Sequence, residues 1–247
     1  MKNKIALITG GNGGIGSAIA TELAAAGARV VINYLHQPEK AEALCASIQS
    51  AGGEAMAVRA DISATAQIEA MFDQVEAAWG TVDVLVNNAG IEIRCPALDF
   101  SEADYARILD TNLKAAFFCA QRALRGMKDR GWGRVINISS VHEIKPTGWS
   151  IPYSMSKGGL AMMTRELAFE FSKFGITINS ITPGAIRTDI NREVLSDPAY
   201  EARVLTKIPA GFIGETTDVA ALVAFLASDR ARYITGASLF IDGGMAL

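Results

Sequence analysis

Cysteine and histidine are scarce in this sequence. The 247 residues include three cysteines, Cys45, Cys95 and Cys119, which are widely spaced and form no C-x-x-C pair. This spacing indicates neither a disulfide framework nor a zinc site. The two histidines, His36 and His142, are too few for a histidine-rich metal centre. We therefore expect no bound metal and a reducing, cytoplasmic location.

A strong charge of one sign and long apolar runs are also absent. The formal net charge of -3 argues against nucleic acid or an anionic membrane as a partner. The first residues lead directly into an apolar strand pattern at 5–8, and no apolar run reaches the length of a membrane span. Because hydrophobic residues make up 50% and charged residues 20%, the composition is typical of a globular protein. Since the net charge argues against nucleic acid and membranes, we expect a small molecule as the partner.

Short apolar runs alternate with longer segments of helical periodicity along the whole chain. This alternation predicts an α/β fold in which a doubly wound, Rossmann-type parallel sheet of about seven strands carries helices on both faces. Because no linker interrupts it, residues 1–247 are expected to form a single dinucleotide-binding domain. The predicted strands are near 4–9, 29–33, 55–59, 82–87, 134–139, 177–182 and 238–241. The predicted helices are near 15–26, 38–51, 64–78, 102–129, 152–174 and 217–228.

Two connections, residues 142–151 and 183–215, are longer than a plain turn between a strand and a helix. In open parallel sheets, ligands bind beyond the carboxyl ends of the strands, so we expect both connections to form the substrate site. The second contains two candidate short helices, 190–195 and 198–206, which would cover the site as a lid.

A glycine-rich turn follows the first predicted strand, in the sequence Thr9-Gly-Gly-Asn-Gly-Gly-Ile-Gly16. Glycines permit a tight turn and close approach of the backbone, and the amino terminus of the next helix offers free N–H groups to a pyrophosphate. A tight connection alone could explain such a turn, but the strand before it and the helix after it favour dinucleotide binding. The expected cofactor contacts here are Gly10, Asn12, Gly14, Ile15 and Gly16.

Tyr153 and Lys157 lie four residues apart in a predicted helix and therefore share one face. A tyrosine that acts as a base at neutral pH needs a pKa well below its usual value of about 10, and a neighbouring cation favours the tyrosinate. The same spacing also arises by chance on amphipathic helices with a solvated lysine, so the pair alone does not decide its role.

Three motifs together resemble the short-chain dehydrogenase/reductase family over nearly the whole chain. They are the G-x-x-x-G-x-G turn, Asn87-Asn-Ala-Gly90 after the fourth strand, and Tyr153-x-x-x-Lys157. The resemblance implies an NAD(P)-dependent oxidoreductase that transfers hydride between nicotinamide and a secondary alcohol or carbonyl. It also implies a homotetramer built on the helices near 102–129 and 152–174, which carry more apolar residues than one core face needs.

The resemblance assigns four catalytic positions. Tyr153 would be the general acid/base, and Lys157 its pKa-lowering partner and a ligand of the nicotinamide ribose. Ser140 precedes Tyr153 by thirteen positions and would bind the substrate oxygen, while strand alternation should turn Ser139 away. Asn112 would hold a water that leads to the lysine, although an asparagine inside a helix could also bond locally.

Further cofactor contacts follow from the same resemblance. They are Tyr34, His36, Asp61, Ile62, Asn88, Gly90, Pro183, Gly184, Ile186 and Thr188. Asp61 would accept from the adenine amine or cap a turn, and these roles are compatible. No acid follows the second strand, where a carboxylate would bond the ribose 2′-OH of NAD. We therefore expect NADP to be accepted, with NAD possible, and His36 to be nearest to the 2′-phosphate.

Ser139-Ser-Val-His-Glu143 and Gly90-Ile-Glu92 resemble the bacterial glucose 1-dehydrogenase branch of the family. In that branch Glu92 and His142 would bond sugar hydroxyls, while Ser140 and Tyr153 hold the anomeric oxygen. The loop 144–150 differs from the glucose enzymes, so another aldose or a polyol is an open alternative. The others are a 3-oxoacyl thioester reductase of acyl carrier protein, a general carbonyl reductase and a catalytically silent dinucleotide sensor.

Overall fold

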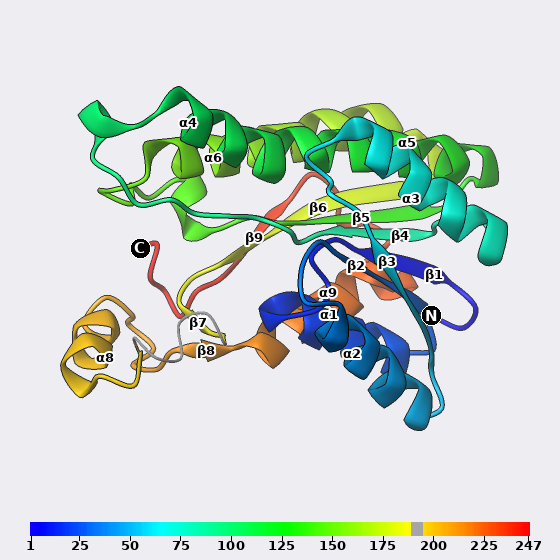
Figure 1. Cartoon of the computed structure of the whole chain (residues 1–247), viewed down its shortest axis with the longest axis horizontal. Coiled ribbons are helices and arrows are strands. Elements are labelled where there is room, and N and C mark those ends of the chain that lie inside the picture. The colour runs from blue at the N-terminus through cyan, green and yellow to red at the C-terminus, as the bar shows by residue number, and fades with distance from the viewer. Residues whose placement is uncertain (189–194) are drawn as a thin grey trace.

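A seven-stranded parallel sheet forms the centre of the computed structural model, which describes residues 1–188 and 195–247 (Figure 1). The strand order is β3-β2-β1-β4-β5-β6-β9, so the chain reverses its direction across the sheet between β1 and β4. The strands are β1 (Ile5–Ile8), β2 (Arg29–Tyr34), β3 (Glu54–Arg59), β4 (Val84–Asn87), β5 (Gly133–Ile138), β6 (Ile176–Pro183) and β9 (Ser238–Ile241). Such a reversal opens a crevice at the carboxyl ends of the strands, where ligands bind in folds of this class.

Helices cover both faces of the sheet (Figure 1). One face carries α1 (Gly14–Ala25), α2 (Pro38–Ser50) and α9 (Thr216–Ala227). The other carries α3 (Thr65–Ala78), α4 (Glu102–Leu109), α5 (Ala115–Arg130) and α6 (Ile151–Phe171). Successive strand residues point to opposite faces, so Leu7 packs in the cluster with α3 and α5 while Ile8 packs in the cluster with α1 and α9. Both faces are therefore buried, which explains why the strands are continuously apolar.

A small two-stranded sheet lies beyond the carboxyl end of β6. It pairs β7 (Ile186–Arg187) with β8 (Gly214–Glu215), and α8 (Pro198–Leu205) stands beside it, away from the main sheet (Figure 1). The predicted helix at 198–206 is thus present as α8. The predicted helix at 190–195 falls almost entirely on 189–194, which lie outside the described residues. Strands of two residues were not predicted, because they are too short to show a hydrophobic period.

The predicted α/β class, the seven strands and five of the six sheet-covering helices are confirmed, with ends displaced by at most three residues. The prediction of one continuous helix at 102–129 was wrong. A π-helical turn at Asp110–Lys114 separates α4 from α5. Asn112 in this turn bonds to Ile91 and Ser156, which lie outside the turn and which a helical period in the sequence does not reveal. No helix among the described residues is long and apolar enough to cross a membrane.

Candidate active site

Tyr153, Ser140 and Lys157 meet where β5 and α6 adjoin. Ser140 follows β5, and its hydroxyl is close enough to the Tyr153 phenol to lower the pKa of that phenol by hydrogen bonding. Lys157 lies one helical turn after Tyr153, with its Nζ 5.6 Å from the centroid of the tyrosine ring. The Lys157 ammonium also donates to the Ile138 carbonyl at 2.9 Å. By contrast, the buried Ser139 hydroxyl has no hydrogen-bond partner among the described residues.

Burial controls the proton affinities of this pair. It raises the pKa of Tyr153 to about 12, although the bond from Ser140 lowers it and the Glu92 carboxylate raises it further. Burial lowers the pKa of Lys157 to about 8, although the Glu143 carboxylate raises this pKa. The depression of the Tyr153 pKa expected from Lys157 is thus not found in the protein alone. Tyr153 is a proton-bearing phenol here, and its ionisation requires further positive charge.

Asn112 connects the segment after Gly90 to α6. Its Oδ1 accepts from the Ile91 N–H at 2.8 Å, and its Nδ2 donates to the Ile91 carbonyl at 2.9 Å and to Ser156 Oγ at 3.1 Å. These bonds are long-range, so the alternative of local bonding within the helix was wrong. A Cβ atom on Gly90 would lie 3.4 Å from Asn112 Oδ1 and 3.6 Å from Lys157 Nζ. The glycine therefore lets this segment approach the Tyr153–Lys157 pair closely.

The glycine-rich turn fits a dinucleotide pyrophosphate. Gly10 and Gly14 have φ angles of +59° and +52°, a left-handed conformation that favours glycine. A Cβ atom on Gly16 would lie 2.4 Å from the Gly10 carbonyl oxygen and 2.7 Å from Asn88 Nδ2. Asn88 donates to the carbonyls of Thr9 and Gly10, which fixes the turn. Helix α1 begins with no side-chain cap and no acidic residue in its first turn, so its amino terminus suits an anion.

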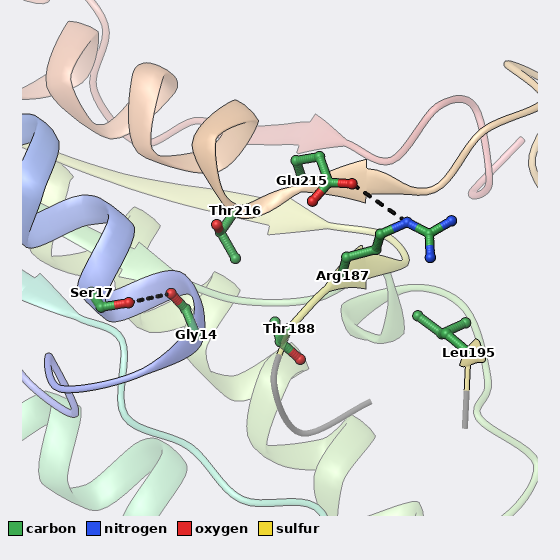
Figure 2. A pocket seen from close by; sticks show the side chains of 7 residues that line it. All are labelled: Gly14, Ser17, Arg187, Thr188, Leu195, Glu215 and Thr216. Atoms are coloured by element: carbon green, nitrogen blue, oxygen red, sulfur yellow. Dashed lines mark hydrogen bonds and ion pairs between the residues drawn. The ribbon is translucent and has the colours of Figure 1, made fainter. Parts of the chain in front are cut away.

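A cavity of about 290 Å³ lies between the start of α1 and the small sheet (Figure 2). It is lined by Gly14, Ser17, Arg187, Thr188, Leu195, Glu215 and Thr216. Arg187 on β7 and Glu215 on β8 form an ion pair of 3.4 Å across its rim, and Arg187 also pairs with Glu201 of α8. Of these residues, the sequence predicts Gly14 and Thr188 individually, as cofactor contacts, and Arg187, Leu195 and Glu215 only as part of the substrate loop 183–215. Arg187 and Glu215 come together through the pairing of β7 with β8, for which the sequence carries no local signal.

The remaining predicted cofactor residues have structural partners of their own. Asp61 Oδ1 accepts from the backbone and the hydroxyl of Ser63, so the turn-capping role is present. The Ile62 side chain packs in the core, which leaves its backbone for a ligand. Asn12 donates to the His36 carbonyl at 2.8 Å and thereby ties the glycine turn to the end of β2.

Four further predicted positions lie close to the same edge of the sheet. Tyr34 is partly buried and packs against the core on the α1 side. Ile186 is buried at the start of β7, after Pro183, the last residue of β6, and Gly184, which follows that strand. A Cβ atom on Gly184 would lie 2.8 Å from Asp242 Cα, so this glycine allows close packing after β9.

The two predicted sugar ligands lie on loops beside Tyr153. Glu92 Oε1 accepts from the Trp149 indole N–H at 3.1 Å, and its Oε2 is 3.7 Å from Arg94 Nε. His142 Nδ1 is 2.8 Å from the Lys145 carbonyl oxygen, and the imidazole packs edge-on to the Tyr153 ring with centroids 6.2 Å apart. The structure thus brings both candidates to the Tyr153 side of the site. Trp149 was predicted only as part of the variable loop 144–150.

With this geometry, comparison with known proteins identifies the class. The chain belongs to the short-chain dehydrogenase/reductase family, since a family model described as enoyl-(acyl carrier protein) reductase matches residues 10–246. It is therefore an oxidoreductase that acts on CH–OH or carbonyl groups with an NAD(P) cofactor, which confirms the predicted enzyme class and cofactor.

Individual relatives carry different substrate names. 3beta-hydroxysteroid dehydrogenase 1 of Eggerthella lenta is 43% identical over 100% of this chain and 95% of its own length. Glucose 1-dehydrogenase 2 of Bacillus subtilis is 39% identical over 100% and 96%. 3-oxoacyl-[acyl-carrier-protein] reductase FabG of Staphylococcus aureus is 40% identical over 98% of each chain. A gluconate 5-dehydrogenase from Burkholderia cenocepacia, solved with NADP and tartrate, superposes with a TM-score of 0.93, is 36% identical and covers 99% and 96%.

Proposed function

We propose that the protein is an aldose dehydrogenase that oxidises the anomeric hydroxyl of a glucose-like sugar. The observation that carries this proposal is the placement of two hydrogen-bond acceptors, Glu92 and His142, beside Tyr153. A polyol brings several hydroxyl donors into a site and cannot leave them unpaired when buried. An apolar alcohol needs no such acceptors.

The hydrogen bond of His142 determines which nitrogen can accept. A backbone carbonyl only accepts, so Nδ1 must carry the proton in its 2.8 Å contact with the Lys145 carbonyl. In the neutral imidazole the other nitrogen, Nε2, is then an acceptor. Its ring lies against Tyr153, so this acceptor suits a substrate hydroxyl next to the reacting carbon.

Other side chains orient the Glu92 carboxylate, and a sugar hydroxyl would be a further donor to it. The Trp149 indole N–H fixes one carboxylate oxygen, and Arg94 stacks over the Trp149 ring with its guanidinium carbon 5.1 Å from the centroid. Each carboxylate oxygen has more than one lone-pair site, so a bond from Trp149 leaves capacity for a substrate donor. This arrangement restricts the carboxylate to one orientation before the substrate binds.

The proposed proton transfer runs through Tyr153. Its phenolate oxygen takes the proton of the substrate hydroxyl, and the Ser140 hydroxyl binds the same substrate oxygen. An oxidised nicotinamide, when bound, would supply the hydride acceptor for the carbon that bears this hydroxyl and a positive charge near the phenol. The buried Lys157 ammonium contributes a second positive charge, which stabilises the phenolate. In the reverse direction the neutral phenol, which is the resident form, donates its proton to the carbonyl oxygen.

A second candidate is a 3β-hydroxysteroid or similar apolar secondary alcohol. It is favoured by the 43% identity with the Eggerthella lenta enzyme and by the exposed side chains of Ile144 and Trp149 on the loop beside the site. These two side chains could cover a flat apolar substrate. A 3-oxoacyl thioester reductase is the further alternative, named by the Staphylococcus aureus relative.

A substrate panel in the wild type and a Glu92→Gln variant separates these functions. kcat/KM would be measured with NAD and NADP for D-glucose, other aldoses, gluconate, a 3β-hydroxysteroid and an acetoacetyl thioester. The proposal expects activity on an aldose and a loss of about tenfold to a hundredfold in Glu92→Gln, because a charged acceptor is removed. Glu22→Gln, an exposed position on α1, is the control and should retain activity. Activity on the steroid or the thioester alone would refute the aldose assignment.

We also propose that the protein is a homotetramer. Large apolar side chains are exposed along α5 and α6, namely Phe117, Met155, Met162 and Phe169, of which Phe169 is 90% exposed. Several large apolar side chains exposed on neighbouring helices are unfavourable on a monomer, and they support an interface built on these two helices. Light scattering after size-exclusion chromatography tests the assembly, and a monomer at micromolar concentration would contradict it.

A reducing, cytoplasmic location is part of the proposal. All three cysteines are free thiols, and burial raises the pKa of Cys119 to about 12, which keeps that thiol protonated and unreactive. Only Cys95 is partly exposed on a loop. An intermolecular disulfide through Cys95 in protein freshly isolated from its source cell would argue against this location.

A further inference from the structure

Arg59 lies beside the end of β2, where dinucleotide-binding folds distinguish NAD from NADP. It is the last residue of β3, and the parallel pairing makes it the partner of Tyr34, although the two are 25 positions apart in the sequence. Its Nε donates to the Leu35 carbonyl at 3.3 Å. This bond directs the guanidinium across the end of β2, towards the connection to α2.

The charge of Arg59 is not neutralised within the described part of the chain. Arg59 is exposed, has no acidic partner at ion-pair distance there, and its two terminal nitrogens make no hydrogen bond there. Arg29, at the opposite end of the same two strands, is partly buried and has an acidic partner. Its Nε pairs with Glu54 at 3.0 Å, and its guanidinium lies 4.4 Å from the Trp79 ring centroid. One arginine of this strand pair therefore has a structural role, whereas the other presents an unused planar fork of donors.

Hydrogen bonds connect the position of Arg59 to the glycine-rich turn. Asn33 Oδ1 accepts from the Gly10 N–H at 3.3 Å, and Asn33 Nδ2 donates to the Ala60 carbonyl at 3.1 Å. The same amide therefore contacts the turn after β1 and the residue that follows Arg59. The glycine-rich turn and the backbone at the end of β3, which carries Arg59, are thus held together through one side chain. An aspartate at position 33 could not donate to the Ala60 carbonyl, so this bond is a structural reason for an asparagine there. The asparagine also lacks the negative charge with which an aspartate would repel the 2′-phosphate of NADP.

We infer that Arg59 binds the 2′-phosphate of NADP and gives this enzyme a preference for NADP over NAD. The inference rests on the assigned NAD(P) cofactor class and specifies it by one residue. A guanidinium matches the geometry of a phosphate group and can donate two parallel hydrogen bonds to it. We place Arg59 before His36 as the principal contact, because a guanidinium is permanently charged and presents a planar fork of donors, which an imidazole lacks.

Calorimetric titration of the purified protein with NADP and with NAD, without substrate, tests this role. In Arg59→Met the Kd for NADP should rise about tenfold to a hundredfold, because charge-assisted bonds to the phosphate are lost. The Kd for NAD should change less than about threefold, since NAD has no 2′-phosphate. The increase for NADP should shrink as salt is added, because the removed contact is electrostatic.

Three controls make the result specific. Arg29→Met removes an arginine from the other end of the strand pair and should leave both Kd values unchanged. Arg59→Lys should keep part of the NADP affinity, because the charge remains while the fork is lost. His36→Ala should have a smaller effect than Arg59→Met. Equal weakening of both dinucleotides in Arg59→Met, no weakening of NADP, or a larger effect in His36→Ala would each overturn the inference. If the wild-type protein bound neither dinucleotide, the cofactor class itself would fail.

Discussion

Replacing Lys157 with methionine should abolish most activity and yet make the protein more stable at neutral pH. Lys157 is 4% exposed, and burial lowers its pKa from 10.5 to about 8. This difference corresponds to about 3 kcal/mol of cost for the buried ammonium at pH 7. Methionine has a similar length and no charge, but it leaves the Ile138 carbonyl without its donor, at a cost of about 1 kcal/mol. The free energy of unfolding should therefore rise by about 2 kcal/mol.

The pH dependence gives this prediction a second, independent signature. Between pH 8 and 10.5 the unfolded lysine still holds its proton while the folded one has released it. The unfolded state then binds more protons, so wild-type stability rises with pH through this window. The advantage of Lys157→Met should therefore be full below pH 8 and shrink towards pH 10.5.

Urea denaturation followed by tryptophan fluorescence at pH 7 and pH 9.5 measures both effects. The cofactor is left out and the protein concentration is held constant, because binding and assembly shift apparent stability. Lys2→Met, at an exposed lysine near the amino terminus, is the control and should change stability by less than about 0.5 kcal/mol. A Lys157→Met variant that is less stable than the wild type at pH 7, or an advantage that is constant with pH, would refute the reasoning.

Three more substitutions test the remaining parts of the site. Gly16→Ala places a Cβ atom 2.4 Å from the Gly10 carbonyl oxygen, so the Kd for the dinucleotide, measured by calorimetry, should rise by about tenfold or more. An unchanged Kd would show that the glycine-rich turn does not bind the dinucleotide. Asn112→Ala should lower the free energy of unfolding, measured by urea denaturation, by about 2 to 3 kcal/mol, because the buried groups bonded to Asn112 lose their partner. A loss below about 0.5 kcal/mol would show that these bonds do not stabilise the fold. Glu143→Gln removes the carboxylate that raises the pKa of Lys157, so this pKa should fall. If the ammonium is the active form, the alkaline limb of the plot of kcat/KM against pH should then move to lower pH. Movement of this limb to higher pH would contradict the effect assigned to Glu143.

The tyrosine itself gives a spectroscopic prediction. Because burial raises the pKa of Tyr153 to about 12, its phenol should remain protonated at pH 10 in the protein without cofactor. The phenolate absorbance at 295 nm should then be the same in the wild type and in Tyr153→Phe at this pH. Tyr153→Phe should also lose orders of magnitude in kcat while it keeps its affinity for the dinucleotide. A phenolate signal from Tyr153 near pH 7 in the absence of cofactor would show that the protein alone lowers the pKa.

The sequence alone determines the features that depend on neighbouring residues. Apolar runs and helical periods give the strands and helices of the α/β fold, because burial on both faces makes each strand apolar. The glycine-rich turn can also be recognised in the sequence, because the left-handed φ angles at Gly10 and Gly14 favour glycine at these positions. The spacing of Tyr153 and Lys157 also follows from a single helical turn.

Only the tertiary structure decides which distant residues meet and how their charges behave. Arg59 becomes the neighbour of Tyr34 through strand pairing, Asn112 bonds to the segment at Ile91, and the Glu92 carboxylate meets a tryptophan 57 positions away. Local periodicity carries no record of such contacts, because they depend on the order and register of elements that are separate in sequence. Burial acts in the same way on the Tyr153–Lys157 pair. The spacing predicts that the two side chains share one face, whereas the surrounding core raises the pKa of the phenol and lowers that of the ammonium.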